Sequence, residues 1–103
     1  MQKYQLVLQF PMTHATDFDR LVAFEDILYR HLPPLGIVDG HDCGAGEFNI
    51  FILTDKPQET FDTAEKVRLI ASPEYNPIVA YREWLGERYI VLWPPDLQAF
   101  NIS

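Results

Sequence analysis

A single cysteine, Cys43, is all that the 103-residue sequence contains. One thiol cannot close a disulfide within the chain, so nothing indicates an oxidising compartment and we expect a cytoplasmic protein. Long apolar runs are missing as well. No stretch approaches membrane-spanning length, and the segment that begins at Met1 lacks the apolar region of a signal peptide. We therefore expect no membrane contact.

Basic residues are scarce, with 8 Lys and Arg against 15 Asp and Glu, which gives a formal net charge of -7. Phosphate backbones and anionic lipids bind clustered positive charge, so nucleic acid is not an expected partner. A basic protein or a cationic ligand fits the negative field better. Apolar residues make up 48% of the chain, and its length suits one domain over residues 1–103.

Alternation and helical spacing divide the first half of the chain into a strand and a helix. Tyr4 to Phe10 alternates apolar and polar residues, which predicts a half-buried strand. Thr16, followed three residues later by Asp19, resembles a capping box that begins a helix, and Pro33-Pro34 ends it. The expected buried stripe of this helix is Phe18, Leu21, Phe24, Leu28 and Leu32.

The rest of the chain reads as two hairpins with a second helix between them. Leu35 to Cys43 and Glu47 to Thr54 predict the first hairpin, and Ile78 to Trp84 with Arg88 to Trp93 predict the second. The helix between them begins near Pro57. Its apolar stripe is Phe61, Ala64, Val67 or Arg68, and Ala71.

The predicted order is therefore β-α-β-β-α-β with an extra C-terminal strand, an α+β arrangement of the ferredoxin-like α/β plait. Each helix should be a right-handed crossover, so that both pack on one face of an antiparallel sheet. The tail from Asp96 to Ser103 is too apolar for a free end, and we expect it to dock on the domain or on a neighbour.

The first hairpin carries the one polar cluster that looks like a site. If Gly44-Ala45-Gly46 is a three-residue loop and Phe48 faces the helices, five polar residues share the opposite, open face of the sheet. A loop of two or four residues would instead place His41 beside Phe48, at a cost of about 1–3 kcal/mol unless the imidazole finds a partner. The five residues predicted to bind a ligand are Asp39, His41, Cys43, Glu47 and Asn49.

Neighbouring strands should extend this open face. Gln5, Val7 and Gln9 of the first strand are expected there. From the second hairpin either Tyr81 and Glu83 or Arg82 and Trp84 join them, and the sequence leaves both alternatives open.

Several chemistries are available to this cluster. A metal site is not expected, because no paired Cys or His element with ligand spacing is present, and no cofactor is expected either. A thiol nucleophile at Cys43 is disfavoured because His41, on the same strand, is too distant for a good hydrogen bond. General acid-base catalysis by His41 with Glu47 is the better enzymatic alternative.

The segment Asp39 to Asp55, with the later Tyr89 to Pro94, resembles a family of small uncharacterised bacterial proteins that share a D-G-H-x-x-G-x-G-E-x-N-I-F-I-x-T-D pattern. The resemblance covers about a quarter of the chain. It implies that the ferredoxin-like plan and this hairpin belong together, and it supplies no catalytic residues.

Three functions follow as expectations. The leading one is a homodimeric binding or regulatory domain that takes a small polar ligand or a protein segment on the open sheet face, with the apolar residues of that face buried between two copies. The enzymatic alternative uses His41. The third is an immunity- or inhibitor-type protein whose acidic surface binds a basic partner.

Overall fold

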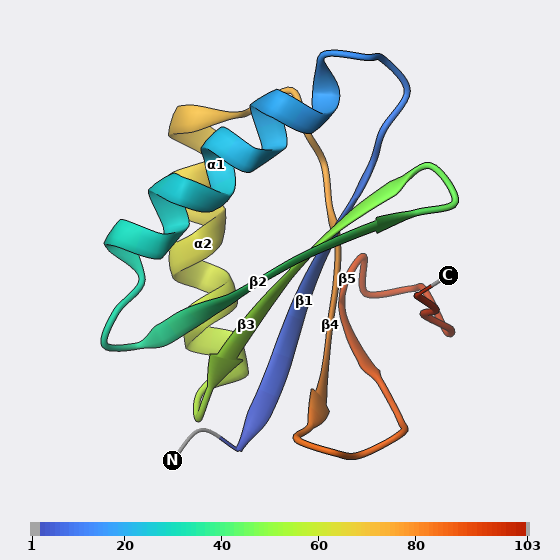
Figure 1. Cartoon of the computed structure of the whole chain (residues 1–103). Helices are drawn as coiled ribbons and strands as arrows, with labels where there is room; N and C mark the ends of the chain where they lie inside the picture. Colours follow the sequence, from blue (N-terminus) through green and yellow to red (C-terminus); the bar gives the residue numbers. More distant parts are fainter. Residues whose placement is uncertain (1–2, 103) are drawn as a thin grey trace.

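The alternating segments of the sequence form one antiparallel sheet, and the two amphipathic segments form helices that pack on it (Figure 1). The structure is a computed structural model that describes residues 3–102. Met1 and Gln2, part of the segment tested for a signal peptide, lie outside this range, as does Ser103. The elements are β1 (Tyr4–Pro11), α1 (Asp17–His31), β2 (Gly36–Gly44), β3 (Glu47–Thr54), α2 (Pro57–Ala71), β4 (Ile78–Glu83) and β5 (Ile90–Trp93).

The strands lie in the order β2-β3-β1-β4-β5, so β1 is central and β2 and β5 are the two edges. The element order β-α-β-β-α-β-β is the predicted one, and it fits the ferredoxin-like plait. No helix among residues 3–102 is long and apolar enough to span a membrane.

The core lies between the helices and one face of the sheet. Phe48, Ile50 and Ile52 of β3 are fully buried against α1 and α2, as their parity predicted. The α1 stripe is confirmed at four of its five positions, Leu21, Phe24, Leu28 and Leu32. The exception is Phe18, which is 43% exposed at the margin of the core.

In the α2 stripe, Phe61 and Ala64 are buried and Val67 is partly buried, whereas Ala71 is exposed. Arg68 is buried too, and its guanidinium donates to the backbone carbonyls of Pro73 and Tyr75. The α2–β4 connection is thereby tied to α2.

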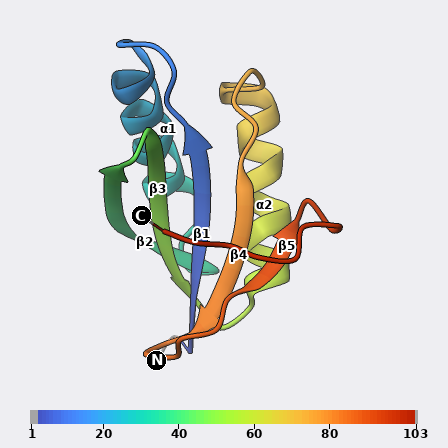
Figure 2. The ribbon, with the colours of Figure 1, turned by 90° about the vertical axis from the view of Figure 1, so that its right-hand side faces the viewer.

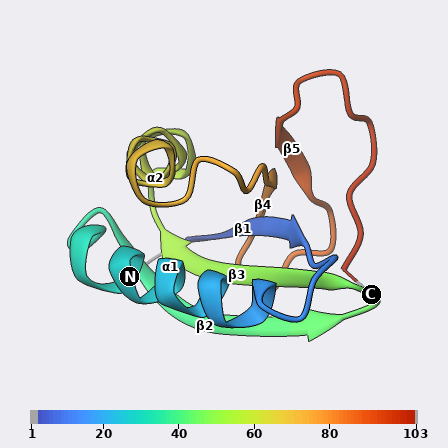
Figure 3. The ribbon, with the colours of Figure 1, turned by 90° about the horizontal axis from the view of Figure 1, so that it is seen from above.

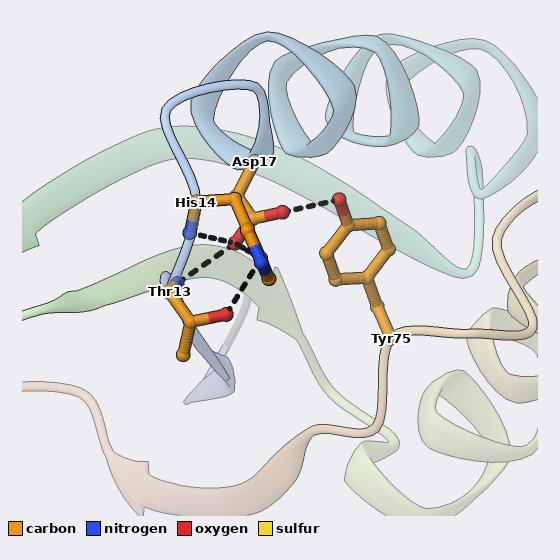
Figure 4. A network of polar contacts seen from close by, with 4 residues as sticks. All are labelled: Thr13, His14, Asp17 and Tyr75. Carbon is orange, nitrogen blue, oxygen red and sulfur yellow. Dashed lines mark hydrogen bonds and ion pairs between the residues drawn. The ribbon is translucent and has the colours of Figure 1, made fainter.

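The start of α1 is fixed by Asp17 rather than by the predicted pair of Thr16 and Asp19. Thr16 occupies the N-cap position but makes no side-chain cap hydrogen bond. Asp17 Oδ2 instead accepts the backbone N–H groups of Thr13 and His14 at 2.8 and 2.9 Å, and its Oδ1 accepts the hydroxyl of Tyr75 at 2.7 Å (Figure 4). These bonds hold the pKa of Asp17 at about 2, below its ordinary value of 3.8, with the Tyr75 bond contributing most.

The loop of the first hairpin has two residues, so the predicted three-residue register is wrong. Gly44 pairs with Glu47, which leaves only Ala45 and Gly46 in the turn. His41 therefore pairs with Ile50 and lies on the helix side of the sheet, not the open side.

The open-face predictions for β1 and β4 have a definite outcome. Gln9 pairs with Asn49 across β1 and β3, and Arg82 pairs with Gln5 across β1 and β4. Arg82 Nε donates to Gln5 Oε1 at 2.9 Å, which shows that Arg82, not Tyr81, is on the open side.

The segment after β5 docks on its own domain. Figures 2 and 3 show it arching away from β5 and running back across the open face of the sheet toward β3, with the helices on the other side. Gln9 Nε2 donates to the backbone carbonyl of Asn101 at 2.9 Å, and the ring of Phe100 contacts that of Tyr89 edge to face. The sheet is therefore covered on both sides.

Candidate functional site

His41 is enclosed on two sides by aromatic rings on the helix face of the sheet. Its imidazole stacks on Phe48 with centroids 4.7 Å apart and planes inclined by 20°, and the ring of Phe18 meets it edge-on at 5.8 Å. The two-residue turn places His41 on the helix side of the sheet, and the first turn of α1 supplies Phe18. The imidazole thus lies between the core and the surface, with its side chain 31% exposed.

The partner that this position requires is Glu25 of α1. Glu25 Oε1 lies 2.8 Å from His41 Nδ1, and the Glu25 side chain is only 13% exposed. A carboxylate bound to Nδ1 orients the ring and leaves Nε2 available to another group. The pair is the arrangement of a histidine base supported by an acid, with Glu25 in the place expected for Glu47.

A groove runs beside this pair between α1 and β2, with a volume of about 340 Å³. Its walls combine apolar side chains with three acidic ones, and no Lys or Arg of residues 3–102 lines it. Asp26, one of the acids, has an exposed ion pair with Arg30 at 3.5 Å. The lining residues are Val22, Glu25, Asp26, Tyr29, Val38, Asp39, Gly40 and His41.

Asp39 reaches the groove at a bulge in β2. The pairing with β3 shifts between Val38 and Gly40, and Gly40 has a φ of 126°, which side chains rarely adopt. Asp39 is the extra residue of this bulge and is exposed. The irregular edge therefore adds a carboxylate close to Glu25 and His41.

Cys43 lies farther along β2 and is exposed. Loss of hydration, followed by the negative charges of Asp42 and Glu25, raises the pKa of the Cys43 thiol above its ordinary value of 9.0. A thiol with a raised pKa is less ionised at neutral pH, which disfavours a thiolate nucleophile here.

Asn49 remains on the open face as predicted, and it is fully buried there. Its Oδ1 accepts a hydrogen bond from Gln9 Nε2 at 3.0 Å, whereas its Nδ2 has no hydrogen-bond partner among residues 3–102. Burying an amide N–H without an acceptor costs about 1–3 kcal/mol. The same Gln9 Nε2 that binds Asn49 also binds the Asn101 carbonyl of the C-terminal segment.

The five residues predicted to form one ligand site thus divide between the two sides of the sheet. His41 and Asp39 face the α1–β2 groove, and Cys43 shares the helix-side parity of His41. Glu47 and Asn49 have the opposite parity. The cause is the single-residue difference in loop length, which exchanges the faces of β2 relative to β3. Within residues 3–102, no group of three or more His, Cys, Asp or Glu side chains is arranged to hold a metal ion.

Sequence reasoning missed Glu25 and the role of Phe18. Both lie on α1, seven residues apart, so they occupy the same flank of the helix about two turns from each other. The spacing of these two residues was the available signal, because Glu25 lies two helical turns after Phe18, at the margin of the apolar stripe.

No protein-family model, curated protein or solved structure matches the chain.

Proposed function

We propose that this chain is a small binding domain that recognises an extended, basic segment of a partner protein at β2 and the α1–β2 groove. The observation that carries the proposal is the groove itself, which lies at an edge strand and is lined by Glu25, Asp39 and Asp26, with no Lys or Arg among the lining residues of the described range 3–102. The partner is thus defined by charge and by extended backbone.

The edge position of β2 supplies the backbone part of this recognition. A strand at the end of a sheet has one row of N–H and C=O groups without a strand neighbour, and an extended segment can add to it. Most of β2 is open to solvent, including Ile37, Asp42 and Cys43. An added strand would therefore meet little steric obstruction from this chain.

Charge supplies the specificity. Side chains of an added strand alternate, so every second residue would face the groove, where a Lys or Arg stem packs on Val22 and Tyr29 while its cationic end meets Asp39. The overall charge of -7 would also speed the encounter with a basic protein. An inhibitor- or immunity-type role is the form of this function in which the basic partner is a toxin or nuclease.

We propose further that the protein acts in the cytoplasm, as a homodimer, and that it belongs with the small bacterial proteins that share the hairpin pattern from Asp39 to Asp55. The lone exposed thiol of Cys43 supports a reducing compartment. The apolar residues Phe51 and Leu53 of the open face, which are only partly buried, support a second copy as the partner on that side.

The groove is tested with a labelled nine-residue peptide of alternating Arg and Val, whose binding to the full chain is followed by fluorescence anisotropy. We expect Asp39→Asn and Glu25→Gln each to weaken binding by about fivefold, which corresponds to about 1 kcal/mol. Binding should also weaken as salt rises from about 0.05 to 0.5 M, because the attraction is screened.

Two controls isolate the groove from the overall charge. Asp62→Asn removes one exposed acid from α2, away from the groove, and should leave the affinity unchanged within error. A peptide with Glu in place of Arg should not bind. Equal losses for Asp62→Asn and Asp39→Asn would show that only net charge matters, and would refute the groove.

A second candidate function, acid-base catalysis at His41, is favoured by the 2.8 Å contact between Glu25 Oε1 and His41 Nδ1. With Nδ1 bound to the carboxylate, Nε2 is the basic atom, and it belongs to a side chain that lines the groove. A substrate held there would exchange a proton with Nε2.

This candidate is tested with 4-nitrophenyl acetate, a general substrate for histidine bases. We expect hydrolysis by the chain to exceed that of the same concentration of imidazole by at least about tenfold. His41→Gln should abolish the excess and Asp62→Asn should not change it. A rate equal to that of free imidazole would eliminate catalysis at His41 with this substrate class.

A further inference from the structure

A second cavity lies at the opposite edge of the sheet from the α1–β2 groove. Its volume is about 380 Å³, and it lies beside the loop that joins β4 to β5. The groove borders edge strand β2, whereas this cavity borders edge strand β5, and the two share no lining residue within the described range 3–102. Ligand pockets have volumes of about 300–1,000 Å³, so this cavity, which we call the β4–β5 pocket, has room for a small molecule.

Side chains of three adjacent strands line the β4–β5 pocket from the helix side of the sheet. Tyr4 of β1 pairs with Glu83 of β4. Tyr81 of β4 pairs with Ile90 of β5, and it also packs against the core between the sheet and the helices. Paired residues, and residues two apart on one strand, have the same parity. All four side chains therefore lie on the helix side, where the register brings them together.

Two tyrosine rings meet at a right angle in this pocket. The ring centroids of Tyr4 and Tyr81 are 5.6 Å apart and the ring planes are inclined by 85°, so the rings form two walls of a corner. Both residues are only partly buried. The face of an aromatic ring carries partial negative charge and attracts cations within about 6 Å of its centroid. The corner therefore favours a positively charged group.

Three hydrogen bonds hold the loop that completes the pocket. The backbone N–H of Trp84 donates to the carbonyl of Lys3 at 2.7 Å, and Figure 1 shows this loop beside the start of β1. The N–H of Gly86 donates to the carbonyl of Glu83 at 2.8 Å, and the carbonyl of Gly86 accepts from Arg82 Nη1. The loop is thus fixed to β1 and β4 before a ligand binds, which reduces the entropy lost on binding.

Three charged side chains also line the pocket, and they have both signs. They are Glu83 at the end of β4, and Glu87 and Arg88 in the loop. All three residues are exposed, and none of them forms an ion pair with another residue of the range 3–102. Unpaired charges of both signs are therefore available to a single ligand that carries both.

The apolar part of the lining selects the kind of cation. The two tyrosine rings and Ile90, which is 49% exposed, offer surface on which methyl groups can pack. A quaternary ammonium carries its charge on such groups, and aromatic rings are its common binding surface in proteins. A primary ammonium is strongly hydrated and gains less from this surface. The pocket therefore suits a methylated ammonium.

We propose that the β4–β5 pocket binds a small zwitterion with a quaternary ammonium group at one end and a carboxylate at the other. The ammonium lies against the rings of Tyr4 and Tyr81. Glu83 and Glu87 balance its charge. Arg88 binds the carboxylate of the ligand. This ligand differs from the extended basic segment of the proposed function, and its site is independent of the groove.

The site is tested by NMR titration of the full chain with glycine betaine, followed at the ring signals of Tyr4 and Tyr81. We expect saturable shifts of both rings, with a dissociation constant on the order of 1 mM. The anion of tert-butylacetic acid has the same shape without the positive charge, and it should bind at least about tenfold more weakly. Choline, which lacks the carboxylate, should bind about fivefold more weakly than betaine.

Substitutions assign the two ends of the ligand. Arg88→Gln should weaken betaine about fivefold without weakening choline, because only the contact with the carboxylate is removed. Tyr81→Leu should weaken both ligands at least about tenfold, whereas Tyr81→Phe, which keeps the ring, should change neither by more than about twofold. Glu87→Gln changes an exposed residue and should weaken both about threefold, which tests the cationic end even if Tyr81→Leu fails to fold. Asp62→Asn on α2 is the control for overall charge and should bind as the unsubstituted chain does.

Three results would contradict the proposal. Equal affinity for betaine and for the anion of tert-butylacetic acid would overturn it, because the pocket would then recognise shape rather than positive charge. Choline that binds as tightly as betaine would exclude a role for Arg88 and thus a zwitterion. Unchanged signals of Tyr4 and Tyr81 at about 50 mM betaine would exclude the site. Betaine should leave binding of the Arg-Val peptide unchanged, so failure of this pocket and failure of the groove are separate results.

Discussion

Asp17 joins three parts of the chain through one carboxylate. Its oxygens hold the loop after β1, the first turn of α1 and, through Tyr75, the connection that follows α2. Arg68 holds the backbone carbonyl of the same Tyr75, so the two helices are linked through a single aromatic residue. The geometry of this network accounts for every oxygen of the Asp17 side chain, which marks it as structural.

The pH dependence of this network has a definite sign. The pKa of Asp17 is about 2 in the folded chain, against an ordinary value of 3.8, so its contribution to stability is complete above about pH 4 and is lost as the pH falls toward 2. We expect Asp17→Asn to lower the melting temperature at pH 7 and to flatten the acid side of the stability profile. Tyr75→Phe should do the same to a smaller extent.

Thermal unfolding followed by circular dichroism between about pH 2 and pH 7 measures both effects. Asp62→Asn, which changes an exposed carboxylate on α2, is the matched control and should keep the steep acid profile. If Asp17→Asn and the unsubstituted chain lost stability in parallel below about pH 4, Asp17 would not be the carboxylate responsible.

His41 shows how far sequence could reach at the residue scale. The alternation of β3 gave the buried face correctly, and the consequence of a two-residue loop, His41 beside Phe48 with a polar partner required, was derivable. The identity of the partner was not. Glu25 reaches His41 only through the rotation of α1 on the sheet, which packing of the whole stripe determines.

At the scale of elements, the turn of the first hairpin determines on which face of the sheet each site residue lies. Both residues of its turn have positive φ, 51° for Ala45 and 76° for Gly46, a combination typical of a type I′ turn. Such turns favour Asn-Gly, and alanine at the first position hides the signal. Gly44 looked like a loop residue because it is glycine, although it pairs with Glu47 in the ladder.

The strain of the left-handed conformation at Ala45 can be measured directly. A left-handed conformation costs a non-glycine residue about 1–2 kcal/mol, so we expect Ala45→Gly to raise the free energy of unfolding by up to about 1 kcal/mol after the entropy of glycine is subtracted. Urea unfolding monitored by tryptophan fluorescence gives the value.

Ala23→Gly provides the opposite case, since Ala23 is an exposed position within α1. We expect it to be destabilising by about 1 kcal/mol. If both substitutions destabilised the chain equally, Ala45 would not be strained in the turn.

The order of strands and helices in the whole molecule could be predicted from hydrophobic periodicity. The position of the C-terminal segment on the open face of the sheet could not. Strand and helix spacing gave all seven elements in order. The tail was expected to dock on the domain or on a neighbour, and it docks on the domain, but its position was not predicted: the open face was expected to be buried in a dimer, whereas Gln9 binds Asn101 of the same chain. A segment without regular structure has no hydrophobic periodicity from which its position could be predicted. Its path depends on single contacts such as that of Phe100 with Tyr89.

The central position of β1 affects the order in which the sheet can form while the chain is being synthesised. β1 precedes every other element, yet its two neighbours are β3 and β4, and Gln9 is paired with both Asn49 and Ile78. While the chain emerges from a ribosome, β1 has both edges open until β3 has been made, about half-way along the sequence, and one edge open until β4 follows. Gln5 and Gln9 interrupt the apolar run of β1. They thereby lower its tendency to pair with another nascent chain while its edges are open.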